Sequence, residues 1–524
     1  MAAVVLSKPK PESALAWAAA AVGVIGVVSA TTPEFANRSD FVQGVLPPGV
    51  PTAARVVSLA FGLALIWLSR SIARRRRRAW QLAVAVVIAS AAAHLAKGLD
   101  FEEAAISCLL LAALLRFRRR FDVPGDPATV RPLLTIGLAG VAAAAVTLGV
   151  ELRGAAVPDE LVHVFFAVGL LVGFYALFLW LRPLSQAVAQ TVGERLAAQE
   201  LVAAYGRDSL SFFALRHDKS YFFSPTRRAF LAYRVVSGAA LVSGDPVGDE
   251  AEFDALLSEF RRVTRARGWR LAILGASGAS LARYERLGLR AIKLGNEAVL
   301  NPAEFSLEGR AIRKVRQSVS RLTKAGYRFR VVAAETVDAA LRAELDAVSS
   351  AWRGGQAERG FSMAIDDLYA PGTTLAVAES PAGGIGGFLH LAPAGRGWSL
   401  STMRRRPGTP NGLMEFLVVE TLAWAGDQQA TELSLNFCVL ADFVAPGIEA
   451  TLPRRAARRA LLAADSVFQL ERLHSFSRKF HPAWRPRYVC VEKLGDLPLV
   501  GLAYLRVEQL VPAAPWRKRT AVSH

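Results

Sequence analysis

The first third of the chain alternates long apolar runs with short polar connections. Six such runs cover residues 14–30, 53–69, 79–96, 104–115, 133–150 and 161–181. Several approach the roughly 20 residues that a helix needs to cross a bilayer. The pattern therefore predicts an α-helical membrane domain of about six spans over residues 1–182.

The charges between the runs predict how this domain is oriented. Arginines crowd residues 70–78 and 116–120, whereas acidic residues gather in 34–40, 100–103 and 151–160. Because arginine-rich connections stay on the cytoplasmic side, we expect a multi-pass protein of the cell membrane with both termini in the cytoplasm. Thr31-Thr32-Pro33 offers no convincing cleavage site, so the first run is expected to be a retained anchor.

Beyond residue 182 the spacing of apolar positions changes from membrane runs to shorter amphipathic segments. A connecting helix is expected over residues 183–205. Strands follow at 233–237, 239–243 and 270–274, with an amphipathic helix at 252–267 before the last of them. This alternation predicts a mixed α/β domain with helices packed on a sheet.

A second series of strands and helices follows residue 327. Strands are expected at 328–333, 375–378 and 387–391, and helices at 337–352 and 413–425. The glycine run 383–387 lacks the lysine and hydroxyl residue of a phosphate-binding loop, so it is expected to be a hairpin turn. We therefore predict two α/β units in tandem, residues 206–326 and 327–510, followed by a basic tail at 511–524.

The charge balance indicates a polyanionic partner. The chain carries 63 Lys and Arg against 44 Asp and Glu, a formal net charge of +19. Part of the excess lies on a basic amphipathic helix expected at 310–324, which includes Arg313 and Arg316. Such a helix contacts nucleic-acid phosphates or lipid head groups, or is a solvated surface helix. The 3 cysteines are far apart and form no metal-ligand spacing, so neither a metal nor another cofactor is expected.

Several short motifs in the cytosolic half resemble one family when taken in order. They are Asp218-Lys219, Gly244-Asp245-Pro246-Val247-Gly248, Gly295 with Glu297, Met403-Arg404-Arg405, Asn411-Gly412 with Glu415, and Lys479-Phe480 with Trp484. Together they are similar to the catalytic domain of the multiple peptide resistance factor family, the phosphatidylglycerol lysyl- and alanyltransferases. The resemblance covers about residues 210–492 and is strongest to the actinobacterial branch, through 411–416 and 434–437.

The resemblance implies a fold and a reaction. The fold is two tandem acetyltransferase-like (GNAT) folds with a tunnel, in which the lipid hydroxyl and the aminoacyl-tRNA meet from opposite sides. The reaction moves a lysyl or alanyl group from aminoacyl-tRNA to the glycerol head group of phosphatidylglycerol, without acetyl coenzyme A. It lowers the negative charge of the membrane and confers resistance to cationic peptides. The implied partners are aminoacyl-tRNA, phosphatidylglycerol and the membrane. Whether the protein forms a homo-oligomer is left open.

The resemblance also assigns site residues. Arg404 is expected at the lipid phosphate or the oxyanion, because a planar guanidinium suits such oxygens. Lys479 is expected at the tRNA end or the donor carbonyl, and Glu415 is the third catalytic candidate. The substrate-binding candidates are Ser401, Asn411, Asn436, Asp245, Arg313 and Arg316.

One position departs from the family pattern. Many members carry aspartate three residues before the arginine, where this chain has Ser401. Glu415 is the nearest matching acid, with a helix-surface carboxylate as the equal alternative. Asp245 has a structural alternative too, through hydrogen bonds to its own turn. Two other functions stay open: an acyltransferase that makes another aminolipid, which the departure at Ser401 favours, and a non-catalytic lipid flippase or scaffold.

Overall fold

The computed structural model describes residues 11–31, 50–98, 101–136, 175–354, 364–439 and 473–508, with a few single positions between these ranges. The chain divides into two compact units. The first comprises Met1–Ser185 with Val263–Trp269, and the second comprises Gln186–Arg262 with Arg270–His524. The predicted basic tail at 511–524 lies outside the described residues.

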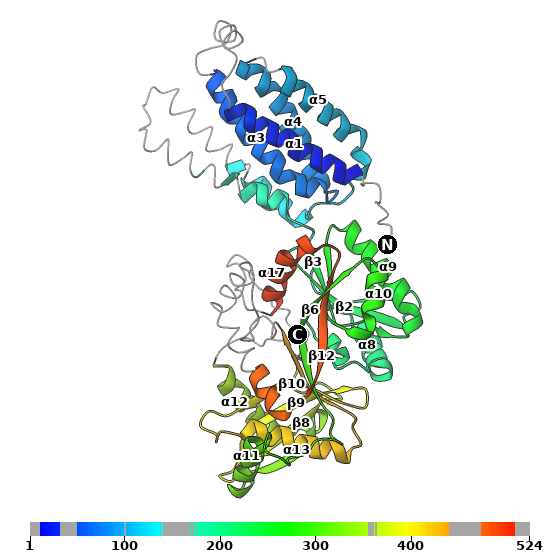
Figure 1. The fold of residues 1–524 in the computed structure, drawn as a ribbon, viewed down its shortest axis with the longest axis vertical. Coiled ribbons are helices and arrows are strands. Elements are labelled where there is room, and N and C mark those ends of the chain that lie inside the picture. Colours follow the sequence, from blue (N-terminus) through cyan, green and yellow to red (C-terminus); the bar gives the residue numbers. More distant parts are fainter. Residues whose placement is uncertain are drawn as a thin grey trace. The chain divides into compact units, whose positions relative to one another are not determined.

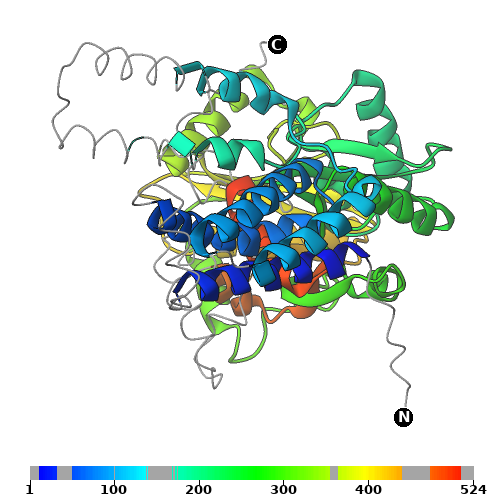
Figure 2. The ribbon, with the colours of Figure 1, turned by 90° about the horizontal axis from the view of Figure 1, so that it is seen from above.

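The first unit contains a bundle of apolar helices. Figures 1 and 2 both show four of them side by side: α1 (Pro11–Thr31), α3 (Val50–Ile72), α4 (Arg77–Gly98) and α5 (Phe101–Arg116). The axes of α1 and α3 come close at two glycines. A Cβ on Gly23 would lie 2.6 Å from the carbonyl oxygen of Gly62, and a Cβ on Gly62 would lie 2.7 Å from that of Gly23. Small residues at a crossing are typical of helices that pack inside membranes.

Among the residues of this unit that the structure describes, two helices are long and apolar enough to cross a membrane. They are Pro11–Thr31 and Arg77–Leu95, and Val57–Ile72 is a shorter apolar helix. Most of the predicted runs 133–150 and 161–181 lies outside the described residues. The structure therefore supports helical segments in the expected places, and the count of six spans stays a prediction.

The connecting helix is shorter than expected. Residues 184–191 are irregular, and α8 covers only Val192–Tyr205. The side chain of Thr191 accepts a hydrogen bond from the backbone of Glu194, whose side chain bonds back to the Thr191 backbone. This reciprocal cap fixes the first turn and explains why the helix begins at Val192.

The second unit is built on one mixed sheet (Figure 1). Within the described residues its 12 strands follow the order β1-β2-β3-β5-β12-β6-β11-β10-β9-β8-β7, with β4 paired to β2. The bounds are β1 Ser220–Phe223, β2 Ala229–Val236, β3 Ala239–Ser243, β4 Val247–Gly248, β5 Arg270–Ser277, β6 Arg290–Leu300, β7 Arg328–Ala333, β8 Thr374–Glu379, β9 Ile385–Ala394, β10 Gly397–Arg405, β11 Leu433–Val439 and β12 Ala483–Val491.

The sheet repeats one pattern twice. Antiparallel strands lead to a parallel pair, β3 with β5 and then β10 with β11. A helix connects each parallel pair: α9 (Phe253–Ala266) in the first half and α13 (Leu413–Asp427) in the second. The other α-helices that the structure describes after β5 are α10 (Leu281–Arg286), α11 (Arg313–Lys324), α12 (Ala339–Arg353) and α17 (Leu497–Val507). The predicted α/β alternation is confirmed.

The sequence suggested that the two halves of the sheet are separate folds divided at residue 326. The structure shows that they are not. β12 comes from the end of the chain but lies between β5 and β6 of the first half. Val500 and Ala503 of α17 join Leu241 of β3 in one buried cluster. The C-terminal residues therefore complete the first half, so the segment 327–510 is not a self-contained second fold.

The two faces of the second half are covered by different helices. Leu389 and Leu391 of β9 pack with Leu417 of α13, and α11 contributes Val315 to the same cluster. Phe388, one residue along, packs instead with Leu345 of α12. Successive side chains of a strand point to opposite faces, so α13 and α12 lie on opposite sides of the sheet.

The glycine-rich segment between β8 and β9 forms the expected hairpin. The two strands pair antiparallel. Gly383 and Gly384 adopt φ values of 86° and 76°, which residues with a side chain rarely adopt. The prediction of a turn rather than a phosphate loop is confirmed.

Candidate functional site

The parallel strands β10 and β11 separate soon after they begin to pair. Their register ends at Ser399 and Ser434. Both strands bulge directly afterwards. The bulge of β10 lies at Ser401, where β10 pairs with β9, and the bulge of β11 lies before Phe437, where β11 pairs with β6. In α/β sheets, substrates bind beyond the carboxyl ends of parallel strands where neighbours part. This end of the pair is therefore the candidate site.

Ser401 and Asn436, both expected to bind substrate, are the residues of the two bulges. The Oγ of Ser401 accepts a hydrogen bond of 2.9 Å from the backbone of Ile365. Asn436 has a φ of 68°, and its Nδ2 donates to the carbonyl oxygen of Leu400 at 2.9 Å. The side chains thus hold the separated strand ends in place, which β-bulges often do beside active sites.

A buried ion pair between Arg487 and Glu297 stabilises the bulge at Asn436. Arg487 of β12 contacts Glu297 of β6 through Nε at 2.8 Å and Nη2 at 2.6 Å. Ser434 donates to Glu297 at 2.6 Å and accepts from the backbone of Asn436 at 3.0 Å. Burial acts to raise the pKa of Glu297, but the charge of Arg487 and the hydrogen bonds to Ser209, Ser434 and Arg487 together outweigh burial, so the pKa is lowered. Glu297 therefore stays ionised and fixes β11 beside β6.

Arg404 lies on the α12 face of the sheet. Its register partner is Phe388, which packs with α12, and the partner of Thr402 is His390. Arg404 is only 7% exposed and His390 is fully buried. Burial first, and the positive charge of Arg404 second, lower the pKa of His390 to about 3. Neither ring nitrogen of His390 has a hydrogen-bond partner among the described residues, nor has Thr402 Oγ1. This face thus combines a cation with unused polar groups.

Glu415 and Lys479 lie on the other face. Glu415 stands in the first turn of α13, and its Oε1 is 2.7 Å from the Nζ of Lys479, in the short helix η7 (Arg478–Phe480). The Lys479 side chain is 46% exposed and also lies over the ring of Phe476, at 5.3 Å. The structure therefore brings these two predicted catalytic residues together but separates them from Arg404 by the thickness of the sheet.

The other predicted contacts surround α11 and the entry to α13. Arg313 and Arg316 are exposed on α11, where Arg316 donates to the carbonyl oxygen of Gly309 at 3.2 Å. The carbonyl oxygen of Asn411, in the loop before α13, accepts a hydrogen bond from Arg321. The loop is thereby tied to α11, and the basic helix flanks the α13 face.

Asp245 belongs to the first half and is far from these groups in the sheet order. Its Oδ1 accepts from the hydroxyl of Tyr284 at 2.6 Å, and its Oδ2 accepts from the backbone of Ser277 at 3.2 Å. Both oxygens are used to join the turn to β5 and α10. This geometry favours the structural alternative, although the bonds go to other segments rather than to its own turn.

The structure also reveals polar residues that the sequence reasoning did not select. His390 is the one polar side chain inside the apolar run of β9 from Phe388 to Ala392, which was a signal that could have been used. Asp366 lies beside the residue bonded to Ser401 and contacts His217. No pattern in the sequence indicated the contact between His217 and Asp366, because the two residues are 149 positions apart.

Comparisons with known proteins agree on one family. The model of the family described as "Phosphatidylglycerol lysyltransferase, C-terminal" matches residues 199–491. The lysylphosphatidylglycerol biosynthesis bifunctional protein LysX of Mycolicibacterium vanbaalenii is 31% identical over 99% of the chain and 52% of its own length. LysX of Rhodococcus jostii is 38% identical over 67% of the chain and 32% of its own length. The chain spans about half the length of the first of these relatives.

Two solved structures resemble the second unit. L-PGS from Bacillus licheniformis has a TM-score of 0.56 at 24% identity and covers 62% of this chain and 98% of its own. The C-terminal domain (DUF2156) of a protein from Agrobacterium fabrum has a TM-score of 0.53 at 25% identity and covers 61% and 98%. Both support the fold predicted from the sequence.

Proposed function

We propose that this chain, which belongs to the phosphatidylglycerol lysyltransferase family, transfers an aminoacyl group from aminoacyl-tRNA to the glycerol head group of phosphatidylglycerol. A lysyl ester would turn an anionic lipid into a cationic one, and an alanyl ester would leave it zwitterionic. Either product lowers the negative surface potential that attracts cationic peptides. The protein would act at the membrane as a multi-pass protein with both termini in the cytoplasm.

The position of Arg404 is the observation that carries the proposal. The side chain is buried beside the separating ends of β10 and β11, on a face with unused hydroxyl and imidazole groups. A buried guanidinium interacts strongly with phosphate or with the oxyanion of a tetrahedral intermediate. The lipid phosphate would therefore bind on the α12 face, and its glycerol hydroxyl would reach the strand ends.

The donor would come from the α13 face. Lys479 is half exposed and held in place by Glu415, so it can contact a phosphate or the donor carbonyl without a large loss of side-chain entropy. Arg313 and Arg316 on exposed α11 offer positive charge to the tRNA backbone. With donor and acceptor on opposite faces, the reacting atoms would meet between the two strand ends and away from bulk water.

A second candidate function changes the acceptor or the donor. Ser401 stands where many family members have aspartate, so the chain has no carboxylate at this position of β10. An acyltransferase that makes another aminolipid fits the same fold. The chemical identity of the lipid product separates the two functions.

The test is lipid analysis of cells that express the full chain. Lipids are extracted, separated by thin-layer chromatography and identified by mass spectrometry. The expected product is an aminoacylated phosphatidylglycerol, and its formation in membranes supplied with labelled aminoacyl-tRNA should stop when ribonuclease is added.

Two variants define the outcome. Arg404→Ala should abolish the product, whereas Arg330→Ala should not, because Arg330 is a surface residue of β7 paired with Glu379. A different aminolipid would support the second candidate. Well-expressed protein that makes no new lipid would contradict both.

A further inference from the structure

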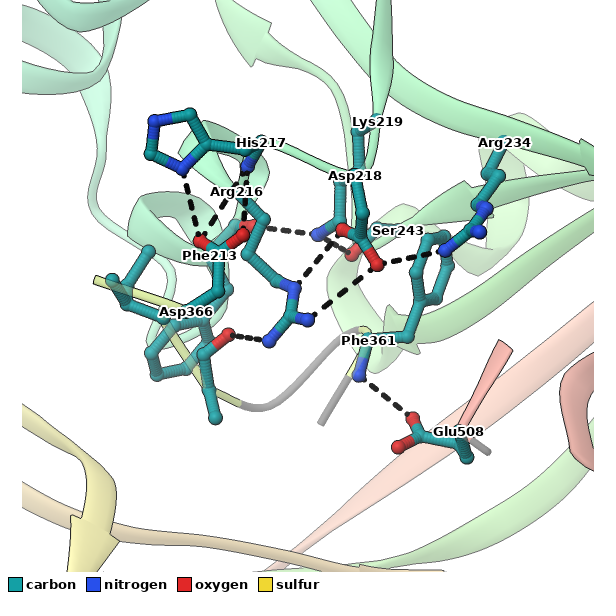
Figure 3. A network of polar contacts seen from close by, with 12 residues as sticks. Phe213, Arg216, His217, Asp218, Lys219, Arg234, Ser243, Phe361, Asp366 and Glu508 are labelled. Atoms are coloured by element: carbon teal, nitrogen blue, oxygen red, sulfur yellow. Dashed lines mark hydrogen bonds and ion pairs between the residues drawn. The ribbon is translucent and has the colours of Figure 1, made fainter. Parts of the chain in front are cut away.

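A histidine and an aspartate from distant segments form a pair beside the site (Figure 3). His217 precedes β1, and Asp366 precedes β8. The Nδ1 of His217 lies 3.4 Å from Asp366 Oδ1, and the backbone N–H of His217 donates to Oδ2 at 3.2 Å. The imidazole is 53% exposed and the carboxylate 23%. The aspartate therefore holds one ring nitrogen and leaves the other accessible.

The two segments that carry this pair are fixed to each other. The buried Arg216 donates to the carbonyl oxygen of Ala364 at 3.0 Å and pairs with Asp218 at 3.0 Å. Figure 3 shows Arg216 between Asp218 and the segment that carries Asp366. The orientation of His217 against Asp366 is thus built into the fold.

The pair adjoins the separating strands. Ile365, the neighbour of Asp366, donates its backbone N–H to Ser401 Oγ at 2.9 Å. Ser401 is the bulged residue of β10, and Thr402 and Arg404 follow it on the α12 face. Ile365 and Ala370 pack in the same buried cluster as Ala392 of β9, which shows that this segment covers the same face.

Asp366 is the ionised member of the pair. Burial acts to raise the pKa of Asp366, but the hydrogen bond from His217 and the charge of Arg216 outweigh it and lower the pKa to about 2. An ionised carboxylate on Nδ1 selects the tautomer in which Nε2 accepts a proton. This is the arrangement that general bases need.

We infer that His217, oriented by Asp366, is the proton acceptor for the lipid hydroxyl and the proton donor to the leaving tRNA. The inference rests on the proposed function. As the glycerol oxygen attacks the aminoacyl carbonyl carbon, its proton passes to Nε2 of His217. The tetrahedral intermediate then breaks the ester bond to the terminal ribose, whose oxygen takes the proton back. One ester bond forms and one breaks, with no net change of protons.

The charges that face the pair come from four segments. They are Arg216, Asp218 and Lys219 beside His217, Asp366 and Asp367 on the covering segment, Arg234 on β2, and Glu508 after α17. Burial lowers the pKa of Lys219 to about 7, so this lysine can also change charge near neutral pH. A test by pH must therefore separate His217 from Lys219.

The experiment measures initial rates with the purified full chain, vesicles that contain phosphatidylglycerol, and tRNA charged with labelled lysine or alanine. The wild-type rate should fall as the pH is lowered, because a protonated His217 cannot accept the proton of the lipid hydroxyl. His217→Gln should lower kcat about 100-fold or more, within the range of general acid–base catalysis, and should flatten this acid limb. The KM for either substrate should change by less than about threefold. A structural role would not remove the acid limb.

Further variants guard against misfolding, and the acid limb of His217→Gln distinguishes His217 from Lys219. Asp366→Asn should lower kcat like His217→Gln, and Asp366→Glu should restore part of the rate. Asp254→Asn, which removes a surface carboxylate paired with Arg283, should leave the rate and the pH profile unchanged. An acid limb that persists in His217→Gln, or a rate within threefold of the wild type, would overturn the inference alone. A wild-type chain that makes no aminoacylated phosphatidylglycerol would overturn the proposed function with it.

Discussion

The ammonium nitrogen of Lys479 lies 2.7 Å from a carboxylate oxygen of Glu415, 64 positions earlier in the chain. The contact joins the short helix η7 to the first turn of α13. It brings together two predicted catalytic residues that no spacing in the sequence relates. It also means that neither group acts independently of the other.

Exchange of Lys479 by methionine removes the cation and keeps most of the apolar side chain. We expect the rate of aminoacyl transfer to fall at least about tenfold, because one charge-assisted contact contributes roughly 1.5–3 kcal/mol. Glu415→Gln keeps an oxygen acceptor and should lower the rate by less. Steady-state rates with aminoacyl-tRNA as the varied substrate measure both effects. Equal rates in Lys479→Met and the wild type would mean that the lysine is only a surface residue.

The stability of both variants is a useful control. Lys479 is 46% exposed, so its ion pair should contribute no more than about 1 kcal/mol to the free energy of unfolding. Urea unfolding followed by circular dichroism should therefore show little change, which separates a loss of rate from a loss of fold.

The Arg487 guanidinium should matter far more for stability. Arg487→Met leaves the fully buried Glu297 without its cation, and such a loss costs about 3–5 kcal/mol. Arg485→Met is the matched variant, two residues along β12, since its partner Glu432 is paired at the surface and the loss should cost less than about 1 kcal/mol. Similar unfolding midpoints for the two variants would contradict the buried network.

Asn436 allows the backbone and side-chain contributions to be separated. Asn436→Ala loses the bond to Leu400 and keeps a β-carbon at a φ of 68°, a conformation that asparagine adopts more readily than alanine. Asn436→Gly loses the same bond but adopts this φ without strain. We expect alanine to cost about 1 kcal/mol more than glycine in the free energy of unfolding. If glycine were the more destabilising of the two, backbone strain at the bulge would not be significant.

His390 should make the second unit sensitive to acid. Burial holds its pKa in the folded state at about 3, whereas an unfolded histidine protonates near pH 6.5. Between these values the unfolded chain binds more protons, so stability rises with pH across this window and is lost as the pH falls through it.

The variant His390→Leu tests this linkage. It removes the titrating ring and two unpartnered nitrogens while it keeps an apolar group on β9. Its stability should decline less steeply below pH 6.5 than that of the wild type, by on the order of 1 kcal/mol per pH unit. Parallel curves for the two proteins between pH 4 and 6 would show that His390 is protonated in the folded state.

Local patterns predicted individual elements well. The expected strands at 239–243 and 328–333 coincide with β3 and β7, because both follow a turn and contain strand-favouring residues such as Val242 and Val331. The expected helix at 413–425 differs from α13 by two residues at its end. The late start of α8 could also have been predicted, since Thr191 and Glu194 have the spacing of a capping box.

Long-range arrangement was beyond local patterns. The position of β12 between β5 and β6, the contact of Arg487 with Glu297 and the pair His217 and Asp366 all join residues more than a hundred positions apart. Apolar periodicity tells which face of a strand is buried but not which strand lies beside it. For the same reason, the family resemblance named Arg404 and Lys479 together as functional cations without showing how they are arranged. Only the packing of α12 and α13 shows that they lie on opposite faces of the sheet.

The insertion of β12 sets the order in which the protein can fold during synthesis. Until residue 491 has left the ribosome, β5 and β6 each lack a neighbour and expose an unpaired edge, which is a template for aggregation. Closure of the sheet then has to join residues such as Glu297 and Arg487 across 190 positions, which is slow because so long a loop must be ordered first. A nascent chain of this protein therefore depends on its last strand, and any premature stop before β12 would release both halves of the sheet incomplete.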